Sequence, residues 1–326
     1  DCLFTFNQRN QTGLVGNLKL EKSKYNSLKQ KLMAEVREEL VKKKKITSII
    51  DIINSPSKKT RSKPLGESLV HRPSVDIEKA FQETSRLVLG RSMSGLPAYG
   101  KWLGRRIRGV EEVGSAKSGQ PVPVAGMPFF MAVKEHVMSD EEALEHGKMA
   151  KLAPAEVEEL TLTNAPEKLA PISDTTVNIV FGKSEDIVGC ACYGNYTSHA
   201  FITSFAYHCK NVAYCFYPRN SENLFGSFAI NSKYCIHCRS SERIMRCFEV
   251  DNATDCADCL FCHNIEGCQD CMFCFNVKSK RYAIGNVEYP KEDYLKLKKL
   301  VLAEISAKLE KDKNLDIDIY NIGSGR

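Results

Sequence analysis

The sequence predicts an α+β protein with a Cys-rich, β-solenoid-like repeat tract that is capped by an amphipathic helix, and with a mixed, largely helical middle region. Three observations predict this fold: a short period within residues 176–289, a segment that occurs at both ends of the chain, and the clustering of cysteine. Of the 14 cysteines, 13 lie between Cys190 and Cys274, and Cys2 lies apart. The expected organisation is a solenoid end with its capping helix (1–45), a basic linker (46–73), the middle region (74–175), the β-solenoid repeats (176–289), and a second capping helix with a tail (290–326).

Residues 1–36 recur as residues 270–305 at a single offset of 269, without a gap. Of these 36 positions 13 are identical, and substitutions such as Val15 for Ile284 conserve volume. Duplicated modules are typical of proteins that build extended surfaces, so the duplication predicts a structural or interaction role. Because residue 1 is Asp and not Met, we expect the numbered chain to begin inside a longer gene product or after processing. Another repeat tract is the expected content of the preceding part.

Each copy of the duplicated segment continues into a predicted amphipathic helix. The first helix spans residues 21–45 and the second starts at about residue 290, where Pro290 suits the first turn. In both, apolar residues recur three or four positions apart and form one stripe. The stripes consist of Tyr25, Leu28, Leu32, Val36 and Leu40 in the first helix, and of Tyr294, Leu297, Val301, Ile305 and Leu309 in the second.

The middle region has an ordinary mixed composition without cysteine. We expect helices over Val75–Leu89, from the capping box Ser139–Glu142 to about Lys151, and over Ala153–Leu160, whereas the prolines of Gln120–Gly126 exclude a helix there. Residues Met127–Val137 are apolar enough to be buried. Trp102 is expected to anchor a helix, with Arg105, Arg106 and Arg108 facing solvent.

The repeat tract has a short internal period. Six elements begin with Asn or Ser and place a residue of buried type four positions later, and their starts are 9 to 12 residues apart. Helical repeats are longer than this, so short strands separated by Asn or Ser corners fit better, with two or three strands in each turn of about 21 residues. The elements are Asn211/Cys215, Asn220/Leu224, Asn231/Cys235, Ser241/Met245, Asn252/Cys256 and Asn264/Cys268.

The cysteines of this tract allow two interpretations. Three groups have the spacing by which thiolates bind zinc or an iron–sulfur cluster. However, the Cys215 position is Leu224 or Met245 in sister elements, which a core position tolerates and a metal ligand does not. We favour core cysteines, with zinc and then a redox cluster as alternatives, so the expected cofactor is none or zinc. The candidate ligands are Cys256, Cys259, Cys262, Cys268, Cys271 and Cys274, with Cys235 and Cys238 upstream.

A basic segment follows the first helix. Residues 1–72 hold 16 Lys and Arg against 7 Asp and Glu, a net charge of +9, whereas the whole chain carries +6. The segment could contact nucleic acid or an acidic partner, but no aromatic residues are interleaved to stack on bases, so we favour a solvated helix end and linker. The candidate contact residues are Lys42, Lys43, Lys44, Lys45, Lys58, Lys59, Arg61 and Lys63.

Location and catalysis are constrained less strongly. No run of about 18 apolar residues predicts a transmembrane helix. Because disulfide scaffolds are usually short, we expect reduced thiols in the cytoplasm or in a particle assembled there. The seven histidines match no catalytic motif, and we expect them to be paired or exposed.

The stretch from about Asn178 to Lys296 closes with a specific motif, Cys271-x-x-Cys274, then Lys280-x-Tyr282-x-Ile284-x-Asn286-x-x-Tyr289-x-Lys291-Glu292-x-Tyr294. This stretch resembles an uncharacterised family of Cys-rich repeat proteins from candidate-phyla bacteria, archaea and tailed phages. The resemblance covers about a third of the chain and implies a repeat fold without an assigned activity. Many members of the family look as though they carry an N-terminal zinc ribbon, which this sequence lacks.

These patterns favour a non-enzymatic structural or scaffold protein. It is expected to assemble through its repeat faces and capping helices, either with itself or with other subunits in a larger complex such as a virion. The first alternative is a zinc- or iron–sulfur-binding module that uses Cys235–Cys274. The second is a nucleic-acid-binding protein that uses the basic segment 42–63.

Overall fold

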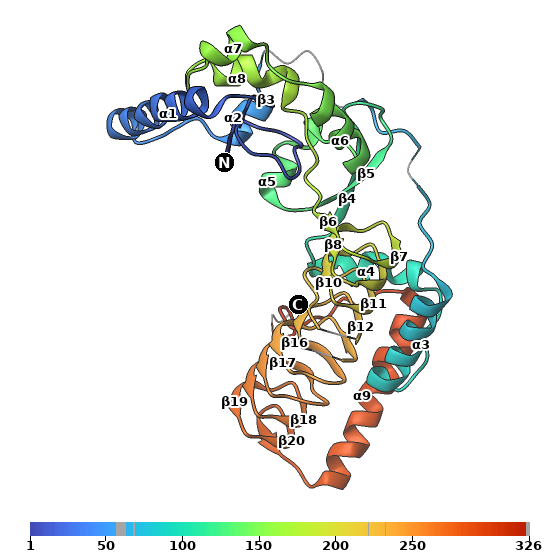
Figure 1. Cartoon of the computed structure of the whole chain (residues 1–326). Coiled ribbons are helices and arrows are strands. Elements are labelled where there is room, and N and C mark those ends of the chain that lie inside the picture. Colours follow the sequence, from blue (N-terminus) through green and yellow to red (C-terminus); the bar gives the residue numbers. More distant parts are fainter. Residues whose placement is uncertain (57–62, 68, 221, 232, 324–326) are drawn as a thin grey trace. The chain divides into compact units, whose positions relative to one another are not determined.

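The computed structural model describes residues 1–56, 63–67, 69–220, 222–231 and 233–323, and the chain forms two compact units. Unit 1 comprises residues 1–69 and 111–178, and unit 2 comprises residues 70–110 and 179–326. The fold is mixed α and β, with one large, mainly parallel sheet (Figure 1). The region expected at 74–175 is shared between the two units, because α3 (Val75–Leu89) belongs with the C-terminal tract.

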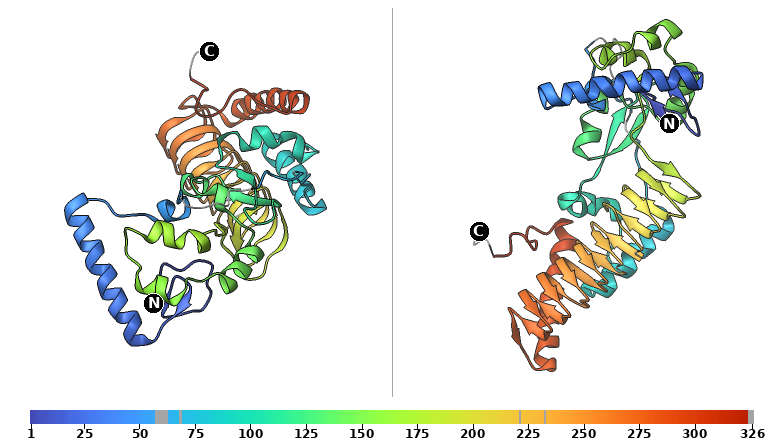
Figure 2. Two further views of the ribbon diagram at one scale, coloured as in Figure 1. Left: turned by 90° about the horizontal axis from the view of Figure 1, so that it is seen from above. Right: turned by 60° about the vertical axis from the view of Figure 1, so that its left-hand side comes forward.

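Unit 2 is built around a stack of short parallel strands (Figure 2). Phe248 lies opposite Leu260, Leu260 opposite Met272, and Met272 opposite Ile284, so the chain returns to an equivalent place at every twelfth residue. We call each such segment a rung. The strands are β6 (Val180–Phe181), β7 (Glu185–Val188), β8 (Ala191–Gly194), β9 (Ser198–Phe201), β10 (Ser204–Tyr207), β11 (Lys210–Ala213), β12 (Glu222–Phe225), β13 (Phe228–Ile230), β14 (Cys235–Ile236), β15 (Arg239–Glu242), β16 (Cys247–Thr254), β17 (Leu260–Glu266), β18 (Gln269–Met272), β19 (Phe275–Lys278), β20 (Arg281–Ile284) and β21 (Val287–Glu288).

The length of a rung varies little. The rung at the start of the stack is one residue longer, since Ile187 lies opposite Ala200. The rung between β12 and β14 is one residue shorter, since Leu224 lies opposite Cys235. The expected turn of about 21 residues is therefore wrong. Only some of the elements that recur along the sequence are one rung apart: Asn252 pairs with Asn264, whereas Asn211 pairs with Asn223 and not with Asn220.

A left-handed backbone conformation at every third residue turns the chain within each rung. From His237 to Gly285, every third residue has φ between 45° and 59°, which places four of them in each rung. Residues other than Gly seldom adopt this region, because Cβ approaches the following carbonyl oxygen. The predicted Asn corners are confirmed, since Asn211, Asn220, Asn231, Asn252 and Asn264 all have positive φ.

One predicted corner is displaced by a residue. Ser240 has positive φ, whereas Ser241 is fully buried in the stack. The buried residue predicted four positions after the corner is also displaced by one residue, because Ile244 is buried and Met245 is 41% exposed. The comparison of Cys215 with Met245 in the sequence was therefore out of register. The comparison with Leu224 was also out of register, because Leu224 lies opposite Val212, although it is buried in the same core.

The residue that follows each left-handed residue enters a narrow core inside the stack. This core is composed of small and medium-sized side chains: cysteine predominates, together with alanine, valine, isoleucine and leucine. Ser227 and Ser241 occupy similar buried positions. A rung that turns at every third residue leaves little room at its centre, which explains why no large aromatic side chain belongs to this core.

A second apolar column lies on the outside of the stack, one residue from each rung, and packs against two helices. The helices are α3 and α9 (Lys291–Asp312), which lie side by side along the stack (Figure 1). Burial of each large side chain stabilises unit 2 by roughly 1.5–3 kcal/mol. The column consists of Phe201, Ala213, Phe225, Ile236, Phe248, Leu260, Met272 and Ile284.

Local sequence explains the helix ends. The hydroxyl of Ser74 accepts a hydrogen bond from the amide of Ile77, and Gly90 ends α3 with φ of 76°. Pro290 precedes α9 as its N-cap residue instead of occupying the first turn. Three single-turn helices follow α3 in the chain: η1 (Leu96–Tyr99), α4 (Gly100–Leu103) and η2 (Gly104–Arg106).

Unit 1 combines short helices with small sheets around its own core. The capping box at Ser139 and Glu142 is confirmed and opens α6, while α2 lies in the segment expected to be a linker. Residues 127–137 are only partly buried, since Phe129 is 50% exposed. The elements are β1 (Cys2–Leu3), β2 (Leu14–Val15), β3 (Leu18–Lys19), α1 (Lys22–Lys43), α2 (Ile49–Ile53), β4 (Val110–Gly114), β5 (Pro121–Ala125), α5 (Pro128–Met131), η3 (Lys134–His136), α6 (Asp140–Met149), α7 (Pro154–Glu158), α8 (Ala165–Leu169) and η4 (Ala170–Ile172).

The first copy of the duplicated segment reproduces the end of the stack in unit 2. Strands β1, β2 and β3 and helix α1 correspond to β18, β20, β21 and α9. Cys2 lies opposite Leu14 as Cys271 lies opposite Ala283, in the same parallel register. The hairpins that follow, β2–β3 and β20–β21, are antiparallel and also share their register.

Side-chain contacts are duplicated as well. The ion pair between Lys29 and Asp1, at 3.0 Å, recurs between Lys298 and Asp270 at 3.2 Å. The side chain of Asn17 accepts a hydrogen bond from the amide of Phe6 at 2.9 Å, and the equivalent bond from Phe275 to Asn286 is also 2.9 Å long. Residues 1–43 thus repeat the last strands of the stack and the helix that follows them.

None of the helices in the described residues combines the length and apolar character that crossing a membrane requires.

The left-handed positions predict an unusual response to substitution. Ser279 is exposed and has φ of 53°. We expect Ser279→Gly to leave the free energy of unfolding within about 0.5 kcal/mol, and Ser279→Val to lower it by about 1–2 kcal/mol, because a β-branched residue is strained at positive φ. Urea denaturation of both variants checks this, and equal stability of the two would contradict it.

Candidate functional site

The structure brings together the six cysteines that the sequence identified as candidate ligands. Cys256, Cys259 and Cys262 belong to one rung, and Cys268, Cys271 and Cys274 occupy the same positions in the next rung. All six are at most 1% exposed and belong to the core of the stack. Cys2 lies in unit 1, away from this group, and is partly exposed.

The thiols in this core face backbone carbonyl groups. Sγ of Cys262 lies 3.3 Å from the carbonyl oxygen of Leu260 in its own rung and 3.6 Å from that of Cys271 in the next. The same two contacts, two residues before and nine residues after the thiol, recur for Cys256, Cys259, Cys268, Cys271 and Cys274. A thiol is a weak donor, so these contacts help to satisfy carbonyl groups that turn away from solvent.

Hydroxyl groups take the same role elsewhere in the core. The hydroxyl of Ser227 donates to the carbonyl of Phe225 at 3.1 Å, and that of Thr203 donates to Phe201 at 3.0 Å. Each contact again reaches two residues back. Cysteine, serine and threonine are therefore alternative solutions to one structural requirement, a small side chain that donates to an inward carbonyl.

Burial favours the protonated form of most thiols in this core. It raises the pKa of Cys190 and of Cys209 to about 12, and it also raises the pKa of Cys262 well above the ordinary value. Thiolates, and not thiols, attack electrophiles and bind metal ions. The cysteines whose pKa is raised are consequently poor nucleophiles at neutral pH. Cys256 and Cys274 differ, because hydrogen bonds with the neighbouring thiols Cys259 and Cys262 lower their pKa.

The arrangement offers no preformed metal site. Among the described residues, no group of three or more His, Cys, Asp or Glu side chains is placed so that it could hold a metal ion. The thiols donate to backbone carbonyl groups in this structure, so zinc binding would require them to leave these contacts. The zinc interpretation stays a prediction without a ready ligand geometry.

The basic segment is only partly free of acidic partners. Lys42 forms an ion pair with Glu38, and Lys43 pairs with Glu39 at 2.8 Å, each one helical turn away in α1. Lys44 ends α1 in a left-handed conformation, and Lys45 and Lys63 are exposed. Lys58, Lys59 and Arg61 lie outside the described residues. Nucleic-acid binding through this segment stays a prediction.

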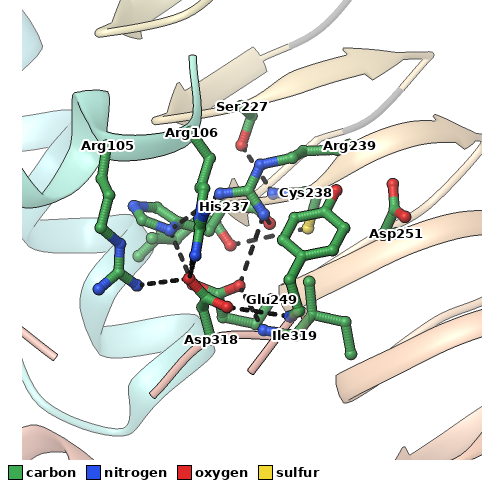
Figure 3. Close-up of polar contacts among 12 residues, drawn as sticks. Arg105, Arg106, Ser227, His237, Cys238, Arg239, Glu249, Asp251, Asp318 and Ile319 are labelled. Carbon is green, nitrogen blue, oxygen red and sulfur yellow. Dashed lines mark hydrogen bonds and ion pairs between the residues drawn. The ribbon is translucent and has the colours of Figure 1, made fainter. Parts of the chain in front are cut away.

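A buried charged cluster that the sequence did not reveal lies on the side of the stack (Figure 3). His237 and Glu249, one rung apart, are both fully buried, and Nδ1 of His237 lies 2.7 Å from Glu249. Arg239 approaches the other oxygen of Glu249 at 3.5 Å. The ring of Trp102 stacks on His237 with 4.4 Å between ring centroids.

The close packing at His237 depends on a glycine. Gly226 precedes His237 by one short rung and has φ of 61°. A Cβ at this position would lie 2.6 Å from the carbonyl oxygen of Leu103 and 2.7 Å from the imidazole of His237. The absence of a side chain therefore allows the α4 segment to approach the stack.

The cluster holds the C-terminal segment of unit 2. Glu249 accepts a hydrogen bond from the amide of Ile319 at 3.2 Å. Asp318, which is fully buried, accepts two hydrogen bonds from Arg106, at 2.8 and 3.0 Å, and pairs with Arg105 at 3.2 Å. Burial opposes its ionisation, but the hydrogen bonds and the charge of Arg106 hold the pKa of Asp318 below its ordinary value.

Two expectations about this region had different outcomes. Trp102 is a buried anchor, as predicted. The expectation that Arg105 and Arg106 only face solvent was wrong, because both pair with Asp318, which lies far away in the sequence. The one sequence signal was the spacing of His237 and Glu249, which is informative only once the length of a rung is known.

Two further histidines of the stack are paired in a similar way, whereas His208 is exposed. Nδ1 of His199 lies 2.7 Å from Asp186, and Nδ1 of His263 lies 3.0 Å from Asp251, in both cases on a neighbouring rung. These pairs fit the expectation of satisfied histidines. Each is a cross-rung contact between positions one rung apart.

The core thiols predict a modest effect of their removal. We expect Cys256→Ser and Cys259→Ser to cost about 1–2 kcal/mol each in the free energy of unfolding, because serine loses volume but can still donate to the inward carbonyl. Cys2→Ser is the matched control and should change the stability by less than about 0.5 kcal/mol. Loss of the whole repeat tract in the double variant, together with metal in elemental analysis, would instead favour a ligand role.

The buried histidine predicts a pH dependence. Burial lowers the pKa of His237, and Arg239 and Arg105 lower it further, although Glu249 opposes this effect. The unfolded chain therefore takes up the proton first, and stability should decrease as the pH falls below about 6.5. In His237→Gln, which can still donate to Glu249 but does not titrate, this decrease should be smaller by up to about 1.4 kcal/mol per pH unit. Urea titrations at pH 7.5 and 5.5 measure it, and equal pH dependence of the two proteins would contradict the assignment.

Comparison with known proteins adds no further assignment. The chain matches no protein-family model, no curated protein and no solved structure.

Proposed function

We propose that the chain is a non-enzymatic structural protein whose repeat tract is a β-solenoid that serves as a rigid scaffold for assembly. The observation that supports this most is the duplication of residues 1–43 as residues 270–312, which we call the end module. Its two copies share the strand register and the long helix that follows the strands. A protein that carries the same packing surface twice is suited to build extended assemblies. The nearly constant length of a rung supports the solenoid interpretation.

The chemistry of the stack agrees with a scaffold. Its interior is filled with small side chains, and its thiols lie against backbone carbonyls. Its buried Glu249 holds the following chain segment through the amide of Ile319. These features favour rigidity over catalysis.

The surface of α9 offers a contact for assembly. Leu295, Leu297 and Leu300 are 45%, 40% and 67% exposed, although Tyr294, Ile305 and Leu309 of the same helix are buried. Leu295 also lines a groove of about 480 Å³ between the end of α3 and α9. Exposed apolar groups on a rigid helix are typical of protein–protein contacts.

The proposal predicts an assembly that depends on α9. We expect light scattering after size-exclusion chromatography to show a multiple of the 36.6 kDa chain mass, and Leu297→Lys with Leu300→Lys to shift it toward the monomer. The melting temperature should stay unchanged, since both side chains are exposed. Lys299→Glu, between them on the same helix, is the control for a change of charge. A strict monomer at about 100 µM that also binds no other subunit would contradict the proposal.

A further inference from the structure

The first copy of the end module has a side that its counterpart keeps covered. This side consists of the outer edge of β1 and of residues 30–43 of α1, and we call it the open rung face. We propose that the open rung face binds the uncapped end of another stack of such rungs. The inference rests on the proposed function and names the partner that the end module takes.

The strand edge is the first observation. In unit 2, β18 lies between β20 and β17, with Leu260 opposite Met272. In unit 1, β1 pairs with β2 and has no second strand among the described residues. An edge strand of this kind presents unpaired backbone groups that can accept another strand.

Exposure follows the same pattern. Cys271 and Met272 are fully buried because the preceding rung covers them, whereas Cys2 and Leu3 are only partly buried. The thiol of Cys2 makes the same contact nine residues ahead, to Gln11 at 3.5 Å, as Cys271 makes to Lys280 at 3.5 Å. The rung itself is therefore formed, and what differs is the layer beneath it.

The second observation is that apolar residues of α1 are exposed where their equivalents in α9 are buried. In α9, Ile305 is 7% exposed and Leu309 is fully buried against α3 and the outer apolar column. The equivalent residues of α1 are Val36, which is half-buried, and Leu40, which is 44% exposed. The apolar stripe continues past the point at which unit 1 covers it, since the buried residues of α1 end at Leu32.

The lengths match a stack of several rungs. Lys29 marks the level of the rung, because it pairs with Asp1 as Lys298 pairs with Asp270. The helix continues beyond it to Lys43, which corresponds to about 21 Å at 1.5 Å per residue. Rungs about 4.8 Å apart would fill this length with about four layers.

The chemistry of the occupant follows from the covered copy. It needs a strand in parallel register one rung earlier, with a small side chain beneath Cys2 and an apolar one beneath Leu3, as Cys259 and Leu260 lie beneath Cys271 and Met272. A second copy of the chain does not provide this end, because β21 and α9 close its last rung. The occupant is therefore a polypeptide whose last rung is uncapped.

The first test uses the full chain. We expect iodoacetamide to label Cys2 at least about ten times faster than any buried cysteine, and residues 30–43 to exchange amide hydrogens at least about ten times faster than residues 299–312. Equal protection of the two helices would overturn the proposal, because the open rung face would then already be covered. Protection of Cys2 that appears only at high protein concentration would show a second copy on this face and would also overturn it.

The second test supplies the occupant. Residues 70–110 and 179–269, which hold α3 and the uncapped stack of unit 2, are joined by a glycine–serine linker and placed before Asp1 of the full chain, so that Gln269 joins Asp1 as it joins Asp270. Labelling of Cys2 should then slow by at least about tenfold, and residues 30–43 should become as protected as residues 299–312. Labelling of the cysteines in the added stack would show that it is not capped, and would overturn the proposal.

Two variants control for non-specific effects. Deletion of the junction residue Gln269 shifts the register by one position, which turns interior side chains outward, and should abolish the protection. Leu40→Glu should leave the stability of the original chain within about 0.5 kcal/mol but prevent the protection of residues 30–43 in the extended chain. Unchanged protection in both variants would contradict specific docking. The two proposals can fail separately. If the original chain is monomeric but Cys2 is protected in the extended chain, self-assembly through α9 is refuted and binding at the open rung face is still supported.

Discussion

The structure of unit 2 depends on one backbone constraint, a left-handed conformation at every third residue. Four such residues close each turn of the chain within one rung, and this small circumference decides which side chains can lie inside. Carbonyl groups that turn inward then need donors that occupy little space. Cysteine meets both conditions, because its thiol is small, apolar and still able to donate a hydrogen bond.

The constant length of a rung also organises the outer surface. Residues one rung apart stand above each other, so a single apolar residue in each rung gives a continuous column from Phe201 to Ile284. Helices α3 and α9 cover this column, and Asp318 and Ile319 attach the following segment through Arg106 and Glu249. The same register aligns His263 with Asp251 on the next rung.

Sequence patterns predicted the parts of the fold that depend on local chemistry. The spacing of Tyr25, Leu28 and Leu32 located α1, and Ser139 with Glu142 located the start of α6. The length of a rung was missed because left-handed positions are also occupied by residues such as Phe261 and Glu249, which carry no turn signal. The Cys-x-x-Cys spacing suggested metal ligands, yet every third residue is also the next interior position of a rung. The cluster of Arg106, Glu249 and Asp318 could not be predicted, because it joins segments that only the tertiary fold brings together.

The long helix α9 has a consequence for how the stack fails. In a stack whose rungs contact only their neighbours, single rungs can unfold one after another from an end. Tyr294 packs near the last rung, and Leu309 packs much further back, so one continuous helix ties distant layers together. Fraying of the outermost layer then requires this brace to detach as well. The rungs that α9 contacts should therefore unfold in one cooperative transition, and the length of α9 sets how many rungs take part.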